Sequence, residues 1–423
     1  MAYKKPDVDF TSSRVTPEGR KSNASMFMVM LGFTFFSASM WAGQNLAAGL
    51  HFGEFIGAII LGGIILGAYT GTLGFIGAKT GLTLDMLAHR SFGRKGSWLP
   101  SAMISFTQIG WFGVGLAMFA IPIAQELMGL EVTPDHMPMQ GYILVVIAGL
   151  LMTASAYFGI KSLTIISYIA VPLVGILGTI AMILAVKHGN ATLVEQFARP
   201  IADGNRLTII AGAGLVIGSF VSGGTATPNF ARFSKNGKIG FWVTVVAFFL
   251  GNSLMFFFGA VSSIYVGGND IFEVMLNLNL FWFAVIVLGL NIWTTNDNAL
   301  YSSGLGLSNI FGLSKKTMVL IGGVIGTIAA VWLYWNFCGW LNALNCSLPP
   351  IGAILIISYF MNQGDYMSDD VQIKAVNWAS VIGVVLGAVT GYFTNKYNLG
   401  IPSINGMVVA VICYIIGYYI KRK

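Results

Sequence analysis

Long apolar stretches alternate with short polar segments along almost the entire chain. Each stretch is close to the roughly 20 apolar residues that a helix needs to cross the hydrocarbon core of a bilayer. The pattern therefore predicts an all-α polytopic membrane protein with twelve transmembrane helices and no separate soluble domain. We place the spans at residues 25–50, 53–78, 98–125, 141–158, 162–186, 207–225, 239–266, 280–306, 317–335, 337–360, 375–394 and 400–420.

Composition agrees with a lipid environment. Apolar residues make up 56% of the 423-residue chain and charged residues only 9%, whereas roughly a quarter of the residues in a soluble domain are charged. Residues 1–24 are polar and basic and lack the short apolar core of a cleaved signal peptide, which predicts a cytoplasmic N-terminal tail. The cysteines, Cys338, Cys346 and Cys413, have neither zinc spacing nor the spacing of a disulfide framework. We expect no resident cofactor.

The positive charge indicates how the chain is oriented in the membrane. The chain has 23 Lys and Arg residues and a net charge of +7. With the N-terminus in the cytoplasm, all but Lys187, Arg199, Arg206 and Lys396 fall on the cytoplasmic side, as the positive-inside rule requires. We therefore expect a multi-pass protein of the inner membrane with both termini cytoplasmic. Nucleic acid is not an expected partner, because a surface that binds it gathers basic residues on one soluble face.

Two predicted spans carry small and polar residues near their middle. One runs over Gly32–Ser39 and the other over Gly218–Pro228, and they begin 186 residues apart. Each mixes Gly, Ser and Thr with aromatic residues, as unwound segments of transporter helices do. Close packing of helices on small residues is the alternative explanation. We expect both helices to be broken and a binding site to lie between them at the bilayer midplane.

The distance between these segments indicates an internal repeat. It corresponds to five helices, and Gln108 precedes Asn291 by a similar 183 residues. Because five is an odd number, the second copy must be inverted in the membrane. The expected parts are a tail at 1–24, a transporter core at 25–360 with inverted repeats at about 25–190 and 207–360, and two further helices with a short cytoplasmic C-terminus at 361–423.

The eighth predicted span contains the most polar run of any span, Asn291–Asn298. On a helix Asn291, Thr294, Thr295 and Asn298 share one face, which offers hydroxyl and amide oxygens without a fixed charge. Hard oxygens of this kind, together with carbonyls freed by an unwound first helix, suit Na⁺. The alternative is that the Thr hydroxyls bond back to carbonyls four residues earlier. Our first hypothesis is a sodium site.

Asp297 lies in the same run but points away from the Asn291 and Thr295 face. A charged carboxylate inside a span is costly, by about 2.5 to 3.5 kcal/mol on insertion scales, so it needs either a function or a partner. A proton carrier and a partnered structural carboxylate are both consistent with the sequence. Its direction favours the structural role.

Gln108 and Trp111 lie one turn apart on one face of the third span. An amide that can donate and accept hydrogen bonds, next to a large flat ring, suits a heteroaromatic base. Phe36 or Phe220 could cover the opposite face of the base, and Ser219 and Ser222 supply hydroxyls. Packing and an interhelical bond are the alternative role for the Gln and the Trp.

Four stretches of the chain, Leu31–Trp41, Gly96–Ser101, Gln108–Pro122 and Val287–Gly306, resemble the nucleobase-cation symport family. The resemblance covers nearly all spans and implies a LeuT-like fold that imports cytosine with Na⁺ as the coupling ion. It places the sodium ion on the backbone carbonyls of Gly32 and Phe35 with Asn291, Thr294 and Thr295. It places the base among Phe36, Gln108, Trp111, Ser219, Phe220, Ser222, Asn291 and Asn296.

The alternatives to a sodium-coupled cytosine importer are another symporter, a channel and an enzyme. A proton-coupled symporter of uracil, a purine or a hydantoin is the alternative, because rotating a Gln or Asn amide exchanges its donor and acceptor. A passive channel would need a continuous polar file and no coupling site. A base-deaminating enzyme would need H-x-E and P-C-x-x-C motifs, which the sequence lacks. We therefore expect a monomeric transporter in the bilayer, and not an enzyme.

Overall fold

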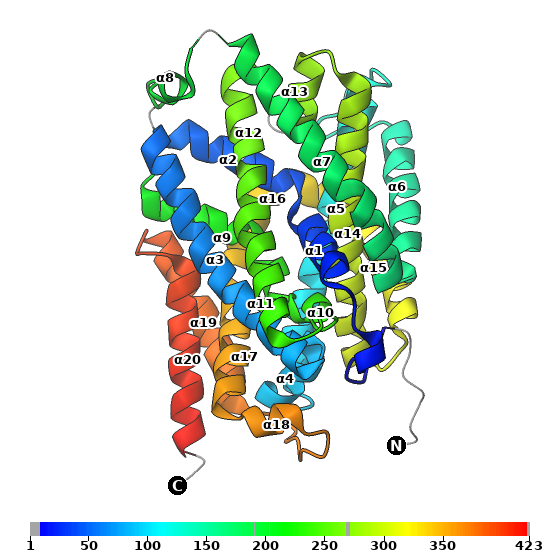
Figure 1. Cartoon of the computed structure of the whole chain (residues 1–423), viewed down its shortest axis with the longest axis vertical. Coiled ribbons are helices and arrows are strands. Elements are labelled where there is room, and N and C mark those ends of the chain that lie inside the picture. The colour runs from blue at the N-terminus through cyan, green and yellow to red at the C-terminus, as the bar shows by residue number, and fades with distance from the viewer. Residues whose placement is uncertain (1–8, 190, 203, 268–270, 421–423) are drawn as a thin grey trace.

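The computed structural model describes residues 9–189, 191–202, 204–267 and 271–420, and every regular element in these ranges is a helix (Figure 1). The long helices are α3 (Phe52–Thr80), α5 (Trp98–Glu126), α6 (Met139–Tyr157), α7 (Ile160–His188), α9 (Ile209–Thr225), α14 (Phe281–Phe311), α15 (Lys315–Trp335), α19 (Trp378–Lys396) and α20 (Pro402–Ile420). The shorter ones are η1 (Pro17–Gly19), α1 (Asn23–Thr34), α2 (Ser37–Gly49), α4 (Leu84–Phe92), α8 (Leu193–Phe197), α10 (Pro228–Ala231), α11 (Gly237–Val246), η2 (Ala247–Gly251), α12 (Asn252–Val266), α13 (Ile271–Asn277), α16 (Phe337–Ser347), α17 (Pro349–Met361) and α18 (Gln363–Met367).

Nine helical stretches in the described ranges are long and apolar enough to cross a bilayer, and the bent pair α1–α2 makes a tenth. The two other predicted spans fall on α9, which has only 17 residues, and on α14, whose 31 residues include the polar run. Each predicted span thus coincides with one helix or with consecutive helices. The fold is that of a helical membrane protein, and twelve crossings stay a prediction.

The expected interruption of the first span is present. Between α1 and α2, Phe35 and Phe36 have extended backbone conformations, and the two helices are bent by 54°. The side chain of Asn291, on α14, accepts hydrogen bonds from the Ser37 backbone nitrogen and hydroxyl at 2.7 and 2.9 Å. These bonds satisfy a free N–H group at the start of α2, so a neighbouring helix caps the break.

The sequence predicted that the sixth span is unwound over Gly218–Pro228, and this prediction is wrong except at Ala226 and Thr227. Helix α9 runs unbroken to Thr225, and the chain leaves the helix only at Ala226 and Thr227, before α10. The glycines of this segment serve close packing. A Cβ on Gly218 would lie 2.3 Å from the amide nitrogen of Asn345, and one on Gly224 would lie 2.5 Å from a methyl group of Thr70. Neighbouring helices occupy the space that these glycines leave.

The seventh span changes its winding halfway. Helix α11 continues through the π-helical turn η2 into α12, which begins at Asn252. A Cβ on Gly251 would lie 2.6 Å from the hydroxyl of Thr34, so the π turn presses against the end of α1. Single π turns in helices are frequent at functional sites. The turn places the amide of Asn252 beside the break in the first span.

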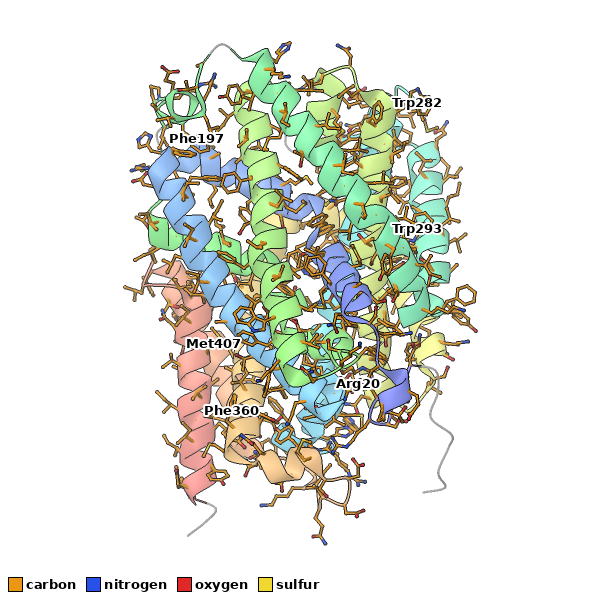
Figure 2. The ribbon with its side chains drawn as sticks, in the orientation of Figure 1. Arg20, Phe197, Trp282, Trp293, Phe360 and Met407 are labelled. Atoms are coloured by element: carbon orange, nitrogen blue, oxygen red, sulfur yellow. The ribbon has the colours of Figure 1, made fainter. Side chains whose placement is uncertain are left out.

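The first helix begins and the last helix ends at the same end of the bundle, where α4 and α18 also lie (Figure 1). We call this the basic end, because Arg14 and Arg90 bond there to the Ser368 carbonyl beside α18. Helices α8 and α13 lie at the opposite end. Apolar side chains cover the outside of the bundle: Trp282 is 70% exposed and Phe360 is 50% exposed (Figure 2). Large exposed apolar side chains over the outer surface are what a lipid environment requires.

Candidate functional site

A small buried cavity lies beside the break between α1 and α2. Its volume is about 10 Å³, which is the room that one water molecule needs. The site is therefore contracted around its own side chains, and a base could enter only after these side chains move apart. The cavity is lined by Phe33, Phe36, Gln108, Trp111, Ser219, Phe220, Ser222, Gly223, Thr295 and Ala299.

Aromatic rings from three helices enclose this cavity. Phe36 lies edge-to-face with Trp111 of α5 at 5.5 Å and with Phe220 of α9 at 6.4 Å between ring centroids. Phe33 lies edge-to-face with Phe220 at 5.5 Å. Edge-to-face contacts are favourable between side chains, but they leave ring faces that a flat ligand could cover. Trp111 and Phe220 both line the cavity, and each lies edge-to-face with Phe36.

The polar groups of the cavity are only partly bonded. The indole nitrogen of Trp111 donates to the Ser222 hydroxyl at 2.8 Å. Gln108 is 1% exposed, and its amide nitrogen has no hydrogen-bond partner. An unpartnered buried donor costs about 1 to 3 kcal/mol, so the fold keeps this group unsatisfied in the closed cavity. A ligand that accepts a hydrogen bond from Gln108 would recover that free energy.

Backbone oxygens converge on the hydroxyl of Thr295. This hydroxyl lies 3.3 Å from the carbonyl oxygen of Phe35, 3.4 Å from that of Phe33 and 3.4 Å from that of Asn291. One hydroxyl hydrogen can serve only one of these three acceptors at a time. The other lone pairs leave a concentration of negative potential between α1 and α14. A small cation that the oxygens could surround suits this position.

The predicted sodium ligands do not all lie at the oxygen cluster around Thr295. Phe35, Asn291 and Thr295 lie together as expected, but the second carbonyl of α1 beside Thr295 belongs to Phe33. A Cβ on Gly32 would lie 2.8 Å from the hydroxyl of Ser167, so Gly32 packs closely against α7; its carbonyl as a sodium ligand stays a prediction. The Thr294 hydroxyl bonds back to the carbonyls of Leu290 and Asn291 at 3.1 and 3.0 Å, as threonines inside helices often do.

Asn291 and Asn296 do not line the cavity, although both were expected at the base. The Asn291 side chain caps α2. The Asn296 amide donates to the carbonyl of Phe112 at 3.1 Å and lies against α5 and α6. The Asn296 side chain points away from the face of α14 that contacts α1, and it contacts α5 and α6 instead. The other six predicted base-site residues do line the cavity.

One of the two carboxylate oxygens of Asp297 has a hydrogen-bond partner, and the other is buried without one. The residue is fully buried, and one carboxylate oxygen accepts a hydrogen bond from Ser155 of α6 at 2.5 Å. The indole of Trp293 donates to the same serine at 2.8 Å. The carboxylate therefore joins α14 to α6, away from the oxygens around Thr295. This placement agrees with the structural role that its direction favoured.

Four residues at this site were not predicted from the sequence. Phe33 contributes a ring and a carbonyl, Gly223 and Ala299 line the cavity, and Asn252 bonds to Ser219 at 3.2 Å. Asn252 had a detectable signal, because an amide inside an apolar span usually needs a specific role. Phe33 and Ala299 are ordinary apolar residues, and only packing reveals them.

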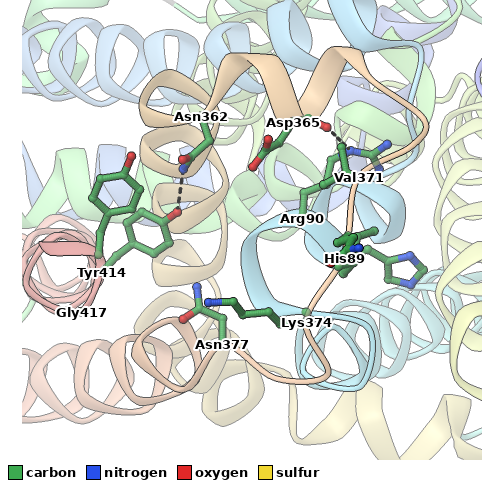
Figure 3. A pocket seen from close by; sticks show the side chains of 13 residues that line it. His89, Arg90, Asn362, Asp365, Val371, Lys374, Asn377, Tyr414 and Gly417 are labelled. Carbon is green, nitrogen blue, oxygen red and sulfur yellow. Dashed lines mark hydrogen bonds between the residues drawn. The ribbon is translucent and has the colours of Figure 1, made fainter. Parts of the chain in front are cut away.

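A larger cavity of about 270 Å³ lies at the basic end, between α4, the segment that follows α18, and α20 (Figure 3). Asn362 donates to the Tyr414 hydroxyl at 3.2 Å on one wall. The Arg90 guanidinium is already bonded to the carbonyls of Asp365, Met86 and Ser368. This cavity is remote from the break in the first span and holds none of the predicted site residues. We do not assign the base to it.

A buried polar chain crosses the basic end close to this cavity. The Ser101 hydroxyl donates to Asp85 at 2.5 Å, Asn309 donates to Ser101 at 2.9 Å, and His89 lies 2.6 Å from the Asn309 oxygen. Burial raises the pKa of Asp85 to about 6, and burial also lowers the pKa of His89. The folded chain thus holds the Asp85 proton more tightly than the unfolded chain does. The contribution of Asp85 to the free energy of unfolding therefore falls as pH rises from about 4 to about 6.

Replacing Asp85 with Asn should therefore stabilise the protein at neutral pH. Asn keeps an oxygen for Ser101 and cannot ionise. In detergent solution we expect a Tm higher than wild type by about 2 °C or more at about pH 8, and a difference close to zero at about pH 3.5, below the pKa of Asp85 in both the folded and the unfolded chain. Thermal unfolding at both pH values measures this. A gain of equal size at the two pH values would contradict the assignment of a proton to Asp85.

Known proteins are similar to this chain over almost its entire length. A family model for permeases for cytosine/purines, uracil, thiamine and allantoin matches residues 14–418. The chain is 45% identical over 411 residues to the cytosine permease of Escherichia coli strain K12, covering 97% of this chain and 94% of the relative. It is equally similar to the cytosine permease of Escherichia coli O157:H7.

Solved structures show the same fold. Mhp1, a nucleobase-cation-symport-1 family transporter in a closed conformation with bromovinylhydantoin bound, superposes with a TM-score of 0.80 at 19% identity, over 97% of this chain and 94% of Mhp1. A Na⁺-coupled sialic acid symporter superposes with a TM-score of 0.68 at 13% identity, over 96% of this chain and 91% of the symporter. The likeness to both structures concerns the fold.

Proposed function

This chain belongs to the family of permeases for cytosine and purines, uracil, thiamine and allantoin, and we propose that it imports cytosine by symport with Na⁺. It is a membrane transporter of the nucleobase-cation-symport-1 type, not an enzyme. The observation that carries the proposal is a set of aromatic and polar side chains placed directly beside a cluster of backbone oxygens. Thr295 belongs to both, because it lines the cavity and lies against the oxygens of Phe33, Phe35 and Asn291.

The aromatic cavity supports a flat heterocycle as the substrate. Trp111 and Phe220 can stack on its two faces, and stacking contributes roughly 1 to 3 kcal/mol per base. Gln108 offers an unpartnered amide donor at the edge of the ring. The bacterial relatives of 45% identity are named for cytosine, which is such a heterocycle. We assign the site to Phe36, Gln108, Trp111, Ser219, Phe220 and Ser222.

The oxygen cluster supports Na⁺ as the coupling ion. An ion bound by these carbonyls would connect α1 to α14. Phe36, which lies in the break that follows α1, lines the cavity. Binding of the ion therefore favours the arrangement that closes on the base. One Na⁺ moved down about 100 mV contributes roughly 2.3 kcal/mol, and an about tenfold gradient adds roughly 1.4 kcal/mol. Together these would sustain accumulation of several hundred-fold.

The contracted cavity fits a cycle of alternating access. A volume of about 10 Å³ holds no base, so the helices around it must separate toward one side of the membrane to admit one. We propose that two inverted five-helix repeats, 25–190 and 207–360, rock about this site, with twelve crossings in all. By the positive-inside rule we assign the basic end to the cytoplasm, because Arg14 and Arg90 bond there to the Ser368 carbonyl beside α18. Both termini would then be cytoplasmic.

Uptake into proteoliposomes tests the proposal. Labelled cytosine should accumulate only with an inward Na⁺ gradient, and added Na⁺ should lower the concentration of cytosine needed for half-maximal uptake. Unlabelled cytosine should compete at least about tenfold better than uracil, hypoxanthine or a hydantoin. Accumulation driven equally well by a proton gradient without Na⁺ would overturn the sodium assignment. Flux that ignores both gradients would instead indicate a channel.

A further inference from the structure

The chain before α1 crosses the basic end of the bundle, and we call residues 9–22 the N-terminal strap. The Arg14 guanidinium donates to the carbonyl of Thr80, at the end of α3, at 2.7 Å. The Arg20 guanidinium donates to the carbonyl of Ser234, which follows α10, at 2.6 Å, and Figure 2 shows Arg20 at this end. The strap is thus bonded to helix ends that lie far from it in the sequence.

Asp9, at the beginning of the strap, holds two further helices together. One carboxylate oxygen lies 2.7 Å from the ammonium nitrogen of Lys315, at the start of α15, and both side chains are buried. The other oxygen accepts a hydrogen bond at 3.2 Å from the backbone nitrogen of Ile160, at the start of α7. Gly159 has a φ of 73°, and a Cβ there would collide with this carboxylate. The start of α7 therefore leaves room for Asp9.

Arg232 binds the same part of the strap through its backbone. Its side chain is fully buried, and its guanidinium donates to the carbonyls of Asp9 and Phe10 at 2.6 and 2.8 Å. It also donates to the Asn229 carbonyl and the Tyr301 hydroxyl, each at 3.1 Å. A buried cation needs such acceptors, because it has lost its water. Two of the acceptors of Arg232 would leave with the strap.

Buried side chains connect the strap to the cavity. Phe33, which lines the cavity, packs on Phe230 at 5.1 Å between ring centroids, and Phe230 packs on Tyr301 at 5.8 Å. The hydroxyl of Tyr301 accepts from Arg232, and the Lys315 ammonium lies 5.0 Å from the centre of the Tyr301 ring. A solute that leaves the cavity toward the basic end therefore meets these rings first and the strap behind them.

The strap also runs directly into α1, whose other end is at the site. The hydroxyl of Ser22, the last residue of the strap, caps α1 by accepting from the backbone nitrogen of Ser25 at 3.1 Å. Helix α1 has 12 residues and is about 18 Å long. Beyond its last turns the carbonyls of Phe33 and Phe35 face Thr295. Because α1 is one continuous helix, a shift of the strap is transmitted to these carbonyls.

We propose that the N-terminal strap is the gate on the cytoplasmic side of the transporter and that Asp9 is its latch. While the Asp9 carboxylate lies between α7 and α15, the path from the cavity to the basic end is closed. The path opens when Asp9 leaves Lys315 and Ile160. The inference rests on the alternating access proposed above and names the segment that must move.

A buried ion pair has the energetics that a latch needs. The loss of water from two charges offsets most of their attraction, so such a pair contributes little net stability but fixes one arrangement of the groups. When the strap leaves, Asp9 and Lys315 both regain water. The closed and open arrangements are therefore close in free energy, and a ligand that binds one of them better can shift the population.

The accessibility of a cysteine behind the gate tests this inference. Ser302, beside Tyr301, is buried, and Ser302→Cys in a chain whose cysteines are replaced with alanine is the reporter. A membrane-impermeant maleimide is added to inside-out membrane vesicles without Na⁺ or cytosine. Asp9→Asn keeps the shape of the side chain and removes its charge, so we expect it to raise the labelling rate at least about tenfold. Lys315→Met should have a similar effect and decides the question if Asp9→Asn does not fold.

The pair can be tested further with a double variant and a matched control. Asp9→Asn with Lys315→Met should be labelled no faster than the faster single variant, because both changes break one interaction. Asp369→Asn removes the exposed carboxylate that lies 2.6 Å from Arg14 in the same strap. Its labelling rate should stay within about twofold of the background.

A second reporter separates an open gate from a loosened fold. Ser380 is buried on α19, where its hydroxyl donates to the Ser91 carbonyl at 2.7 Å, so Ser380→Cys should stay unlabelled in every variant. Labelling of both reporters, or slow labelling of Ser302→Cys in both the Asp9 and the Lys315 variant, would overturn the latch. These measurements need no substrate. A wild-type chain that accumulates no cytosine would instead overturn the proposed function and leave the labelling result to stand by itself.

Discussion

Replacing Thr295 with alanine should abolish Na⁺-dependent uptake of cytosine. The Thr295 hydroxyl is the side-chain group that faces the carbonyls of Phe33, Phe35 and Asn291 together. Without it, an ion at this position loses an oxygen, and the three carbonyls lose the hydrogen that relieves their mutual repulsion. Initial uptake in proteoliposomes with a Na⁺ gradient should fall at least about 100-fold, toward the rate without Na⁺.

The controls for this variant separate the hydroxyl from the shape of the side chain. Thr295→Ser keeps the hydroxyl and should retain most Na⁺ activation. Thr390→Ala removes a hydroxyl that bonds back to Leu386 on the exposed face of α19, so it should leave uptake unchanged. If Thr295→Ala kept the Na⁺ dependence of wild type, the ion would have to bind elsewhere and the cluster between α1 and α14 would lose its assigned role.

Replacing Trp111 with alanine should weaken cytosine binding by about 5-fold to more than 100-fold, since stacking contributes roughly 1 to 3 kcal/mol per base. The indole supplies one stacking surface, lies 5.5 Å from Phe36 between ring centroids, and donates to Ser222. Its loss would also leave the Ser222 oxygen without its donor. The Kd for cytosine in saturating Na⁺ measures the effect.

Trp111→Phe separates the two contributions of this residue. Phenylalanine keeps a ring for stacking but has no hydrogen for Ser222, so cytosine binding should weaken less than in the alanine variant. The Na⁺ affinity without cytosine should be unaffected in both, because the Trp111 indole bonds to Ser222 and packs on Phe36. Wild-type affinity for cytosine in Trp111→Ala would remove the indole from the pocket.

Several features of the protein follow from residues that are close in the sequence. The apolar stretches predicted the helices, because burial in lipid requires each crossing segment to be apolar over its own length. The mixture of Gly, Ser and Phe after Gly32 predicted the break at Phe35 and Phe36. Gln108 and Trp111 face one cavity because residues three apart share a face of a helix.

Other features depended on which helix lies opposite. Gly218 and Gly224 suggested an unwound helix, but Asn345 and Thr70 fill the space beside them and α9 stays helical. Within one polar run, Thr295 turns to α1 while Asp297 turns to α6. Periodicity shows that these residues point in different directions, but it does not show which neighbour each one meets.

The sequence by itself thus determined the membrane environment, the helices, the first break and the residues that share each helix face, because these properties depend on local composition and on 3.6-residue geometry. The tertiary structure alone decided that Phe33 supplies a carbonyl beside Thr295, that Asn296 leaves the site for α5, and that Asn252 reaches Ser219. The rotation and crossing of packed helices set these contacts, and they arise from side chains far apart in the chain.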